Sequence, residues 1–175
     1  MKRINDILIK CNVIEVVGSD DKMVSCLSFD SRKSGAETVF FAVRGTQVDG
    51  HDYISKAIEQ GCRVVVCEHL PENVNDDVTY YVVDNTAKAL GLAASEFYGR
   101  PSEKLHLVGV TGTNGKTTIA TLLYRLFFNA GYPCGLLSTI ENRINNTVVP
   151  STHTTGDQIQ INEMLSKMVD AGCEY

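Results

Sequence analysis

A lysine and two threonines at residues 116–118 follow a glycine-rich stretch, and residues 109–118 read GVTGTNGKTT. Glycines let the backbone curl with its N–H groups pointing inward, a lysine supplies a cation, and a threonine hydroxyl can ligate Mg²⁺. These residue types in this order are those of a phosphate-binding loop. The usual spacing of Gly, four residues and then Gly-Lys-Ser/Thr would put the first glycine at position 110, where Val110 stands.

The segments on either side of this loop have the patterns needed to position it. LHLVGV (105–110) predicts a buried strand that runs into the loop, and KTTIATLLYRLFFNAG (116–131) predicts an amphipathic helix whose first turn adds partial positive charge. PCGLLSTI (133–140) predicts a second strand, so residues 105–140 are expected to form a β-α-β unit of a parallel sheet. The alternative is a plain strand-to-helix turn, in which Gly and Asn are also common.

Upstream of the loop, short β-rich runs alternate with helical patterns. Strands are expected at 23–31, 38–45, 63–69 and 79–84, and helices at 51–61 and 85–99, the second opening with a capping Asn85. The polar segment 99–104 contains Gly and Pro and is the expected linker, which gives domains at 1–100 and 105–175. After residue 140 the chain is polar and irregular until a helix begins at Asp157, with Gln160 completing a variant of the capping box.

Composition restricts the class of protein. The 175 residues are 43% hydrophobic and 21% charged, which is typical of a soluble globular protein. The net charge of −5, with no basic block, argues against a nucleic-acid partner. No signal-peptide core and no apolar run of membrane-spanning length occurs. Six scattered cysteines without a CxxC pair, and four dispersed histidines, argue against structural zinc and predict a reduced, cytoplasmic protein.

TGTNGKTT after a Val-Gly-Val strand resembles the nucleotide loop of the Mur ligases and the folylpolyglutamate synthetases, which carry Gly-Thr-Asn-Gly-Lys. The displaced glycine is therefore a family variant of the loop, and Thr117 after Lys116 fits the Mur branch. The resemblance implies an amide-forming ligase that uses ATP and Mg²⁺, with Lys116 catalytic and Thr117 a metal ligand. The ATP-binding residues that it implies are Gly112, Thr113, Asn114, Gly115, Lys116, Thr117 and Thr118.

Two further stretches resemble the Mur ligases that add the third residue of the peptidoglycan stem peptide. They are LSFDSRKSGAETVFFAVRGTQVDGHDYISKAIEQG and STHTTGDQ…MVDAGC; DSR and DGH also occur in the D-Ala-D-Ala-adding branch, so these two motifs alone do not separate the two branches. The resemblance implies UDP-MurNAc-L-Ala-D-Glu and a diamino acid, meso-diaminopimelate or L-lysine, as substrates. The implied substrate-binding residues are Phe29, Ser31, Thr46, Gln47, Val48, His153, Thr154 and Thr155.

The expected fold is thus α/β: a small α/β N-terminal domain that binds UDP, followed by the start of a P-loop, parallel-sheet domain that binds ATP. Two strands and two helices are too few to close the second domain, which predicts that it is cut off at Tyr175. By the resemblance, further Mg²⁺ ligands and the domain that selects the amino acid lie beyond residue 175. We therefore expect a monomer that binds substrates without completing the reaction. The alternatives are a general P-loop ATPase or kinase, the D-Ala-D-Ala-adding Mur ligase and a non-catalytic UDP-binding module.

Overall fold

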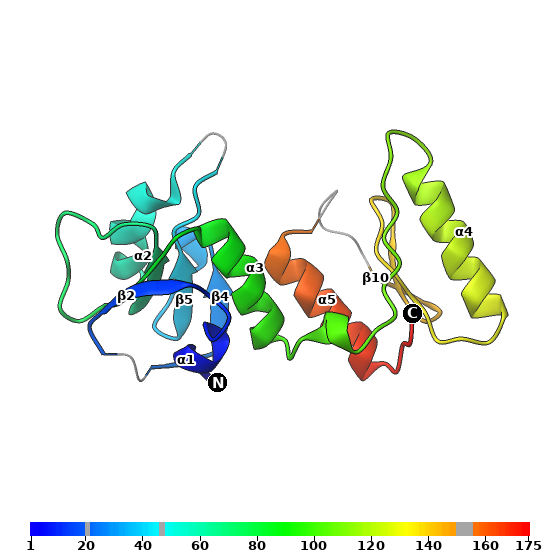
Figure 1. Ribbon diagram of the computed structural model, residues 1–175, viewed down its shortest axis with the longest axis horizontal. Helices are drawn as coiled ribbons and strands as arrows, with labels where there is room; N and C mark the ends of the chain where they lie inside the picture. The colour runs from blue at the N-terminus through cyan, green and yellow to red at the C-terminus, as the bar shows by residue number, and fades with distance from the viewer. Residues whose placement is uncertain (20–21, 46–47, 150–155) are drawn as a thin grey trace. The chain divides into compact units, whose positions relative to one another are not determined.

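The computed structural model describes residues 1–19, 22–45, 48–149 and 156–175 (Figure 1). The chain divides into two compact units, Met1–Phe97 and Tyr98–Tyr175. The division lies beside the Gly- and Pro-containing segment 99–104, where Gly99 and Arg100 adopt left-handed backbone conformations. Each unit has its own hydrophobic core.

The first unit is built on a five-stranded sheet with the strand order β2-β7-β6-β5-β4. Strands β4 to β7 are parallel neighbours, and β2 is antiparallel to β7 at the edge. Every residue of β5, β6 and β7 is buried, as expected for parallel strands covered on both faces. The bounds are β2 Val13–Val17, β4 Cys26–Ser28, β5 Thr38–Phe41, β6 Val64–Cys67 and β7 Thr79–Val83.

The strands predicted from the four β-rich runs are confirmed, and so are the two helices predicted at 51–61 and 85–99, whereas β2 and the short helix Ile4–Ile7 formed where the sequence analysis predicted no element. The expected helix at 51–61 begins with a 3₁₀ turn, and Gly61 ends it with a φ of +97°. Asn85 caps the other helix by accepting the Lys88 N–H at 2.7 Å. The helical bounds are α1 Ile4–Ile7, η1 Ser31–Lys33, η2 Gly50–Tyr53, α2 Ile54–Glu59 and α3 Thr86–Phe97, and a short ladder pairs β1 Lys2–Arg3 with β3 Met23–Val24.

The second unit combines two long helices with a small antiparallel sheet of order β10-β9-β8. Its elements are η3 Pro101–Glu103, α4 Lys116–Asn129, β8 Gly135–Leu136, β9 Asn142–Ile144, β10 Thr147–Val149 and α5 Gln158–Asp170. The predicted capping box is confirmed: Asp157 accepts the Gln160 N–H at 2.9 Å, and the Gln160 side chain accepts the Asp157 N–H at 3.3 Å. The region after residue 140, expected to be irregular, instead forms the β9–β10 hairpin, in which Asn145 takes a φ of +48°.

The strand predicted at 105–110 is not formed. Leu107 and Val108 are 54% and 63% exposed, and among the described residues this segment makes a backbone bond to a neighbour only at His106, which donates to Glu174 O at 2.8 Å. Gly135 N–H in turn donates to Tyr175 O at 2.8 Å. The β-α-β unit expected over 105–140 is therefore present only in part, since an extended segment becomes a strand only where a neighbour supplies partners along its length.

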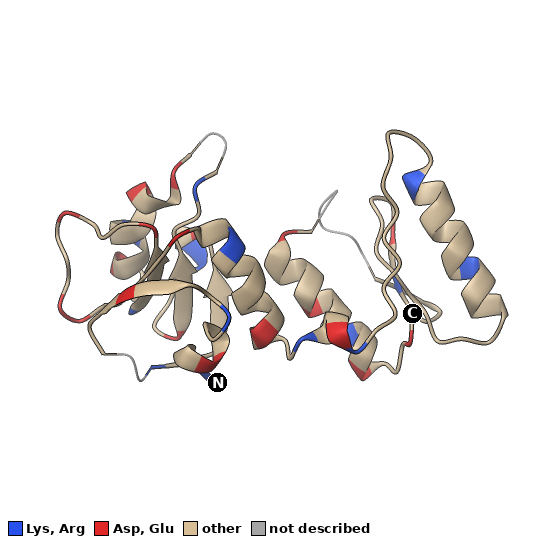
Figure 2. Ribbon diagram, in the orientation of Figure 1, with Lys and Arg blue, Asp and Glu red and all other residues tan. Residues whose placement is uncertain are grey.

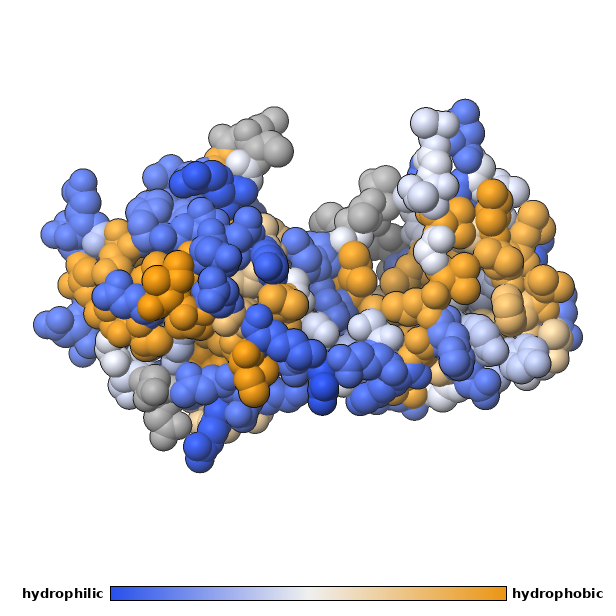
Figure 3. All heavy atoms as spheres, viewed as in Figure 1, coloured by the Kyte–Doolittle hydropathy of each residue, from blue (hydrophilic) through white to orange (hydrophobic). Residues whose placement is uncertain are grey.

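The second unit leaves much apolar surface uncovered. Figure 3 shows apolar surface around α4, where Ile119, Leu122 and Leu126 are exposed. Another face of the same helix lines a cavity of about 160 Å³, together with residues that include Leu107, Leu136 and Tyr175. Within the described part of the chain, no helix has the length and apolar character needed to cross a membrane. All six cysteines are free thiols.

Replacing Asp157 by alanine should destabilise the second unit by about 1 kcal/mol, because the N-cap carboxylate and its reciprocal bond to Gln160 are lost. Denaturant unfolding followed by circular dichroism measures this. The matched control is Glu163→Ala on the same helix, which removes only an exposed pair with Lys167 and should cost a few tenths of a kcal/mol. Equal losses in the two variants would contradict the capping role.

Candidate functional site

The backbone at residues 112–115 has the curl that the glycines predict. Gly112 has a φ of +145° and Gly115 a φ of +78°, both in the region where a side chain would introduce strain. Gly115 is also the N-cap residue of α4, and no side chain caps this helix. The glycines at these two positions are therefore required by the backbone itself.

The first turn of α4 has backbone donors that the helix cannot use. The first helical bond runs from Ile119 N–H to Gly115 O at 2.9 Å, which leaves the amides of residues 116–118 without an acceptor within the helix. The charged residues of α4 are Lys116 and Arg125, with no carboxylate among them (Figure 2). Amides and helix dipole together make this end of α4 suited to an anion.

Lys116 folds back over the loop that precedes it. Its Nζ donates to Gly112 O at 2.6 Å and to Thr113 O at 3.3 Å, while the side chain stays accessible to solvent. An ammonium group has three donors, so one remains for a ligand. The lysine cation and the amides of α4 are thus brought together, as the sequence predicts for a phosphate-binding loop.

The structure adds a residue to this site that the sequence analysis missed. Thr139, three residues after β8, places its Oγ1 3.2 Å from the Thr117 Oγ1. Two hydroxyl oxygens side by side offer the hard oxygen ligands that Mg²⁺ prefers. The available signal was the position of Thr139 at the end of the run 133–140, since strand ends and helix starts meet at one edge in such units.

In the first unit, Phe29 and Ser31 lie at the carboxyl end of β4 and are held by a compact turn. The Asp30 carboxylate accepts the Arg32 backbone N–H at 3.0 Å and its Nε and Nη2 at 2.9 and 2.8 Å. The side-chain bond from the Arg32 guanidinium lowers the pKa of Asp30 to about 2. Phe29 is 42% exposed, whereas Ser31 is 5% exposed. The turn therefore leaves Phe29 accessible to solvent and buries Ser31.

After β5, residues 43–45 pair with residues 48–50 near the carboxyl ends of the parallel strands. Gly50 N–H donates to Val43 O at 3.0 Å and Gly45 N–H to Val48 O at 2.9 Å, with a bridge between Arg44 and Asp49. We call the paired residues 43–45 and 48–50 the Arg44 hairpin. Val48 is 52% exposed on its second arm.

The structure describes three of the eight predicted substrate-binding residues. Phe29, Ser31 and Val48 follow neighbouring parallel strands, β4 and β5, and so lie at one edge of the sheet. The other five predicted residues lie outside the described residues: Thr46, Gln47, His153, Thr154 and Thr155. Gly112 to Thr118 all lie in the loop and the first turn of α4.

Two family models match the chain. The catalytic domain of the Mur ligase family matches residues 23–98, and the Mur ligase middle domain matches residues 110–175. The chain belongs to the Mur ligase family. The sequence resemblance is thereby confirmed, and the displaced glycine of the loop is a feature of a Mur ligase sequence.

Two curated Mur ligases are close relatives, both named UDP-N-acetylmuramoyl-L-alanyl-D-glutamate–2,6-diaminopimelate ligase. The protein from Phocaeicola vulgatus is 52% identical over 163 residues, which are 93% of this chain and 34% of that protein. The protein from Cytophaga hutchinsonii is 52% identical over 174 residues, which are 99% of this chain and 36% of that protein. The chain thus spans about a third of the length of these relatives.

A solved Mur ligase has a similar fold. The UDP-N-acetylmuramoylalanyl-D-glutamyl-2,6-diaminopimelate–D-alanyl-D-alanyl ligase from Acinetobacter baumannii matches with a TM-score of 0.52 and 22% identity, over 82% of this chain and 28% of that chain. At this identity the likeness establishes the fold alone. It supports the α/β fold class expected from the sequence.

The ion pair between Asp30 and Arg32 should make stability depend on pH. The pKa of Asp30 is about 2 in the folded chain and about 3.9 in an unfolded one. A lowered folded-state pKa contributes stability that is fully present above the unfolded value and is lost as the pH falls through the folded value. Asp30→Asn should therefore be less stable than the parent at pH 6, and the difference should shrink as the pH falls from 4 toward 2, as urea unfolding would measure.

Arg32→Gln is the matched variant for this measurement, because it keeps the carboxyl group and removes its partner. It should lose the part of the pH-dependent stability that comes from the guanidinium and keep the smaller part that comes from the backbone N–H of residue 32. A stability difference between the parent and Asp30→Asn that stays constant between pH 6 and pH 2 would show that the pair does not contribute in this way.

Proposed function

We propose that this chain carries the nucleotide-sugar-binding and ATP-phosphate-binding parts of an ATP-dependent amide-forming ligase of peptidoglycan precursor synthesis. Its substrate would be UDP-MurNAc-L-Ala-D-Glu. The relatives named above favour 2,6-diaminopimelate over L-lysine as the amino acid that is added. The observation that carries the proposal is the uncapped start of α4, with Lys116 lying over Gly112 and Thr113 in a chain of this family.

The loop fits the phosphates of ATP by its donors and its charge. The amides of residues 116–118 would hold phosphate oxygens, and Lys116 would exchange the Gly112 and Thr113 carbonyls for the β- and γ-phosphates. The amides and the lysine lie at the same end of α4, so a single phosphate group can use both. Bound ATP would supply the γ-phosphoryl group that activates the D-Glu carboxylate as an acyl phosphate, leaving ADP, and attack by the amine would then form the amide and release phosphate.

Mg²⁺ would be held at the start of the same helix. Thr117 is the ligand that the family resemblance implies, and its hydroxyl oxygen fits a hard cation. We add Thr139 as a partner, because its hydroxyl lies 3.2 Å from that of Thr117 and orients it. The metal would offset the repulsion between the γ-phosphate and the substrate carboxylate, which is the main electrostatic obstacle to this reaction.

We assign the uridine end of the substrate to the carboxyl ends of the parallel strands in the first unit. Open α/β sheets bind ligands at these ends, where Phe29, Ser31 and Val48 lie. The exposed Phe29 ring offers an apolar face for stacking a base. Thr46 and Gln47 are proposed for the same site, and His153, Thr154 and Thr155 for the muramoyl-peptide part, on the resemblance alone.

Ligand-induced stabilisation separates the two proposed sites. Each ligand at 100 times its dissociation constant should add about 2.7 kcal/mol of stability. Lys116→Ala should lose the thermal shift with Mg·ATP and keep the shift with UDP-MurNAc-L-Ala-D-Glu, whereas Ser31→Ala should do the reverse. Arg125→Ala is the control, because it removes the other cation of α4 and should leave both shifts intact. A shift of the parent with ATP but with no UDP compound would favour a general P-loop ATPase.

The 175-residue chain should bind without turning over. Measured as phosphate release, its activity with ATP, Mg²⁺, UDP-MurNAc-L-Ala-D-Glu and 2,6-diaminopimelate should equal that of the Lys116→Ala variant. The reason is that these 175 residues span only about a third of the length of the relatives, whose names describe the complete ligase. Release above the Lys116→Ala background that also requires the UDP-sugar dipeptide would refute this expectation.

A further inference from the structure

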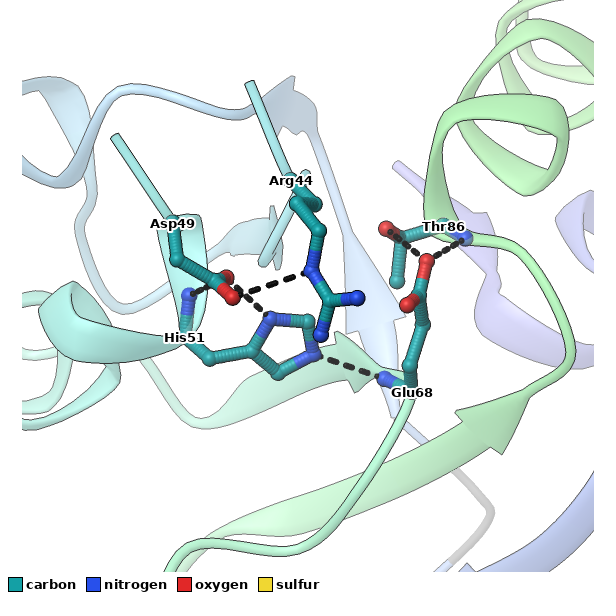
Figure 4. A network of polar contacts seen from close by, with 5 residues as sticks. All are labelled: Arg44, Asp49, His51, Glu68 and Thr86. Atoms are coloured by element: carbon teal, nitrogen blue, oxygen red, sulfur yellow. Dashed lines mark hydrogen bonds and ion pairs between the residues drawn. The ribbon is translucent and has the colours of Figure 1, made fainter. Parts of the chain in front are cut away.

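Five polar residues form a connected network in the first unit, at the edge of the sheet where the Arg44 hairpin begins (Figure 4). Asp49 accepts from the Arg44 Nε at 3.1 Å and pairs with His51 Nδ1 at 2.6 Å. His51 Nε2 accepts the Glu68 backbone N–H at 2.8 Å. The Glu68 carboxylate accepts both the N–H and the hydroxyl of Thr86 at 3.0 Å.

The hydrogen-bond partners of His51 show which of its two ring nitrogens carries the proton. Because Nε2 accepts a backbone N–H, it carries no proton, and so Nδ1 carries the proton and donates it to Asp49. The side chain is only 5% exposed and stacks on the His69 ring with 4.2 Å between the ring centres. Asp49 is kept ionised, since the His51 backbone N–H and then its ring lower the pKa of the Asp49 carboxyl. His51 is therefore held on both nitrogens and on one ring face.

Gly50, between these two residues, is required by a close approach of the backbone. A Cβ at this position would lie 2.6 Å from both the N and the O of Val43. That contact lets the two arms of the Arg44 hairpin close, with Gly50 N–H bonded to Val43 O. Each residue of the Asp49-Gly50-His51 sequence thus has its own structural role.

The network joins three segments that are far apart in the sequence. It ties the base of the Arg44 hairpin to the residue after β6 and, through Glu68, to the first residue of α3. The bond from the Thr86 N–H also lowers the pKa of the Glu68 carboxyl, so the carboxylate stays charged at the positive end of that helix. The start of helix α3 is thereby connected, through Glu68 and His51, to the Arg44 hairpin that follows β5.

We propose that His51 is a positioning residue for the nucleotide-sugar site: by bridging Asp49 to the Glu68 amide, it holds the Arg44 hairpin, with Val48 on its second arm, at the edge of the sheet that also carries Phe29 and Ser31. The inference rests on the proposed function for the ligand that is bound there. The bracing itself follows from the contacts. His51 acts through the hairpin and does not contact the ligand.

The test compares binding with stability in the 175-residue chain. His51→Ala should weaken the binding of UDP-MurNAc-L-Ala-D-Glu and of UDP by roughly tenfold, measured calorimetrically at a temperature where each variant is folded. Val39→Ala is the control, because it cuts a fully buried side chain near the amino end of β5 and lowers stability without touching the network. Its dissociation constants should stay within about twofold of the parent, since its effect is confined to the core.

A conservative variant separates positioning from packing. His51→Gln can place its Oε1 near the position of Nε2 and accept the Glu68 N–H again, so it should recover most of the lost affinity. Affinity in His51→Ala equal to that in Val39→Ala would overturn the proposal. So would a His51→Gln variant that binds no better than His51→Ala.

Amide hydrogen exchange tests, without any ligand, whether His51 holds the Arg44 hairpin in place. In His51→Ala the amides of Gly45, Gly50 and Glu68 should lose protection, while those in the middle of β6 keep it. Unchanged protection at Gly45 and Gly50 would overturn the positioning role, whatever the binding data. If the parent binds neither UDP compound but the exchange result is as expected, the proposed function fails and the bracing of the hairpin stands.

Discussion

Full burial of β5, β6 and β7 is the constraint on which the first unit depends. Strands covered on both faces leave little room for polar side chains within the sheet. Polar residues therefore gather where the chain leaves the parallel strands, and open α/β sheets bind ligands at that edge. The residues found there are Asp30 and Ser31 after β4, Arg44 after β5, Glu68 after β6 and Thr86 after β7.

Helix starts in this chain differ in how their backbone donors are satisfied. Among the described helices of twelve residues or more, α3 begins with bonds to Asn85 and Glu68, and α5 begins with the capping box of Asp157. The start of α4 has no side-chain cap. A capped helix start is a structural element, whereas an uncapped start beside Lys116 is available to an anion. This difference supports assigning the phosphates to α4.

The second unit shows how strongly strand formation depends on neighbours. Residues 105–110 have the apolar pattern of a buried strand, yet Leu107 and Val108 are exposed, and only His106 makes a backbone bond to a neighbouring segment within the described chain. The Asn145-Asn146 turn shows the converse. The short strands β9 and β10 on either side of it pair because the turn brings them together, and β8 pairs with β9 in turn.

The sequence by itself determined four strands of the first unit (β4, β5, β6 and β7), its helices α2 and α3, the capping box at Asp157 and the backbone curl of the glycine-rich stretch before α4. Each depends on residues close together in the chain, through periodicity, a cap or a backbone angle that only glycine tolerates. Only the tertiary structure decided that Thr139 lies beside Thr117, that His51 joins Asp49 to Glu68 and that residues 105–110 form no strand. These contacts join residues many positions apart, and which segments become neighbours depends on the packing of the whole unit.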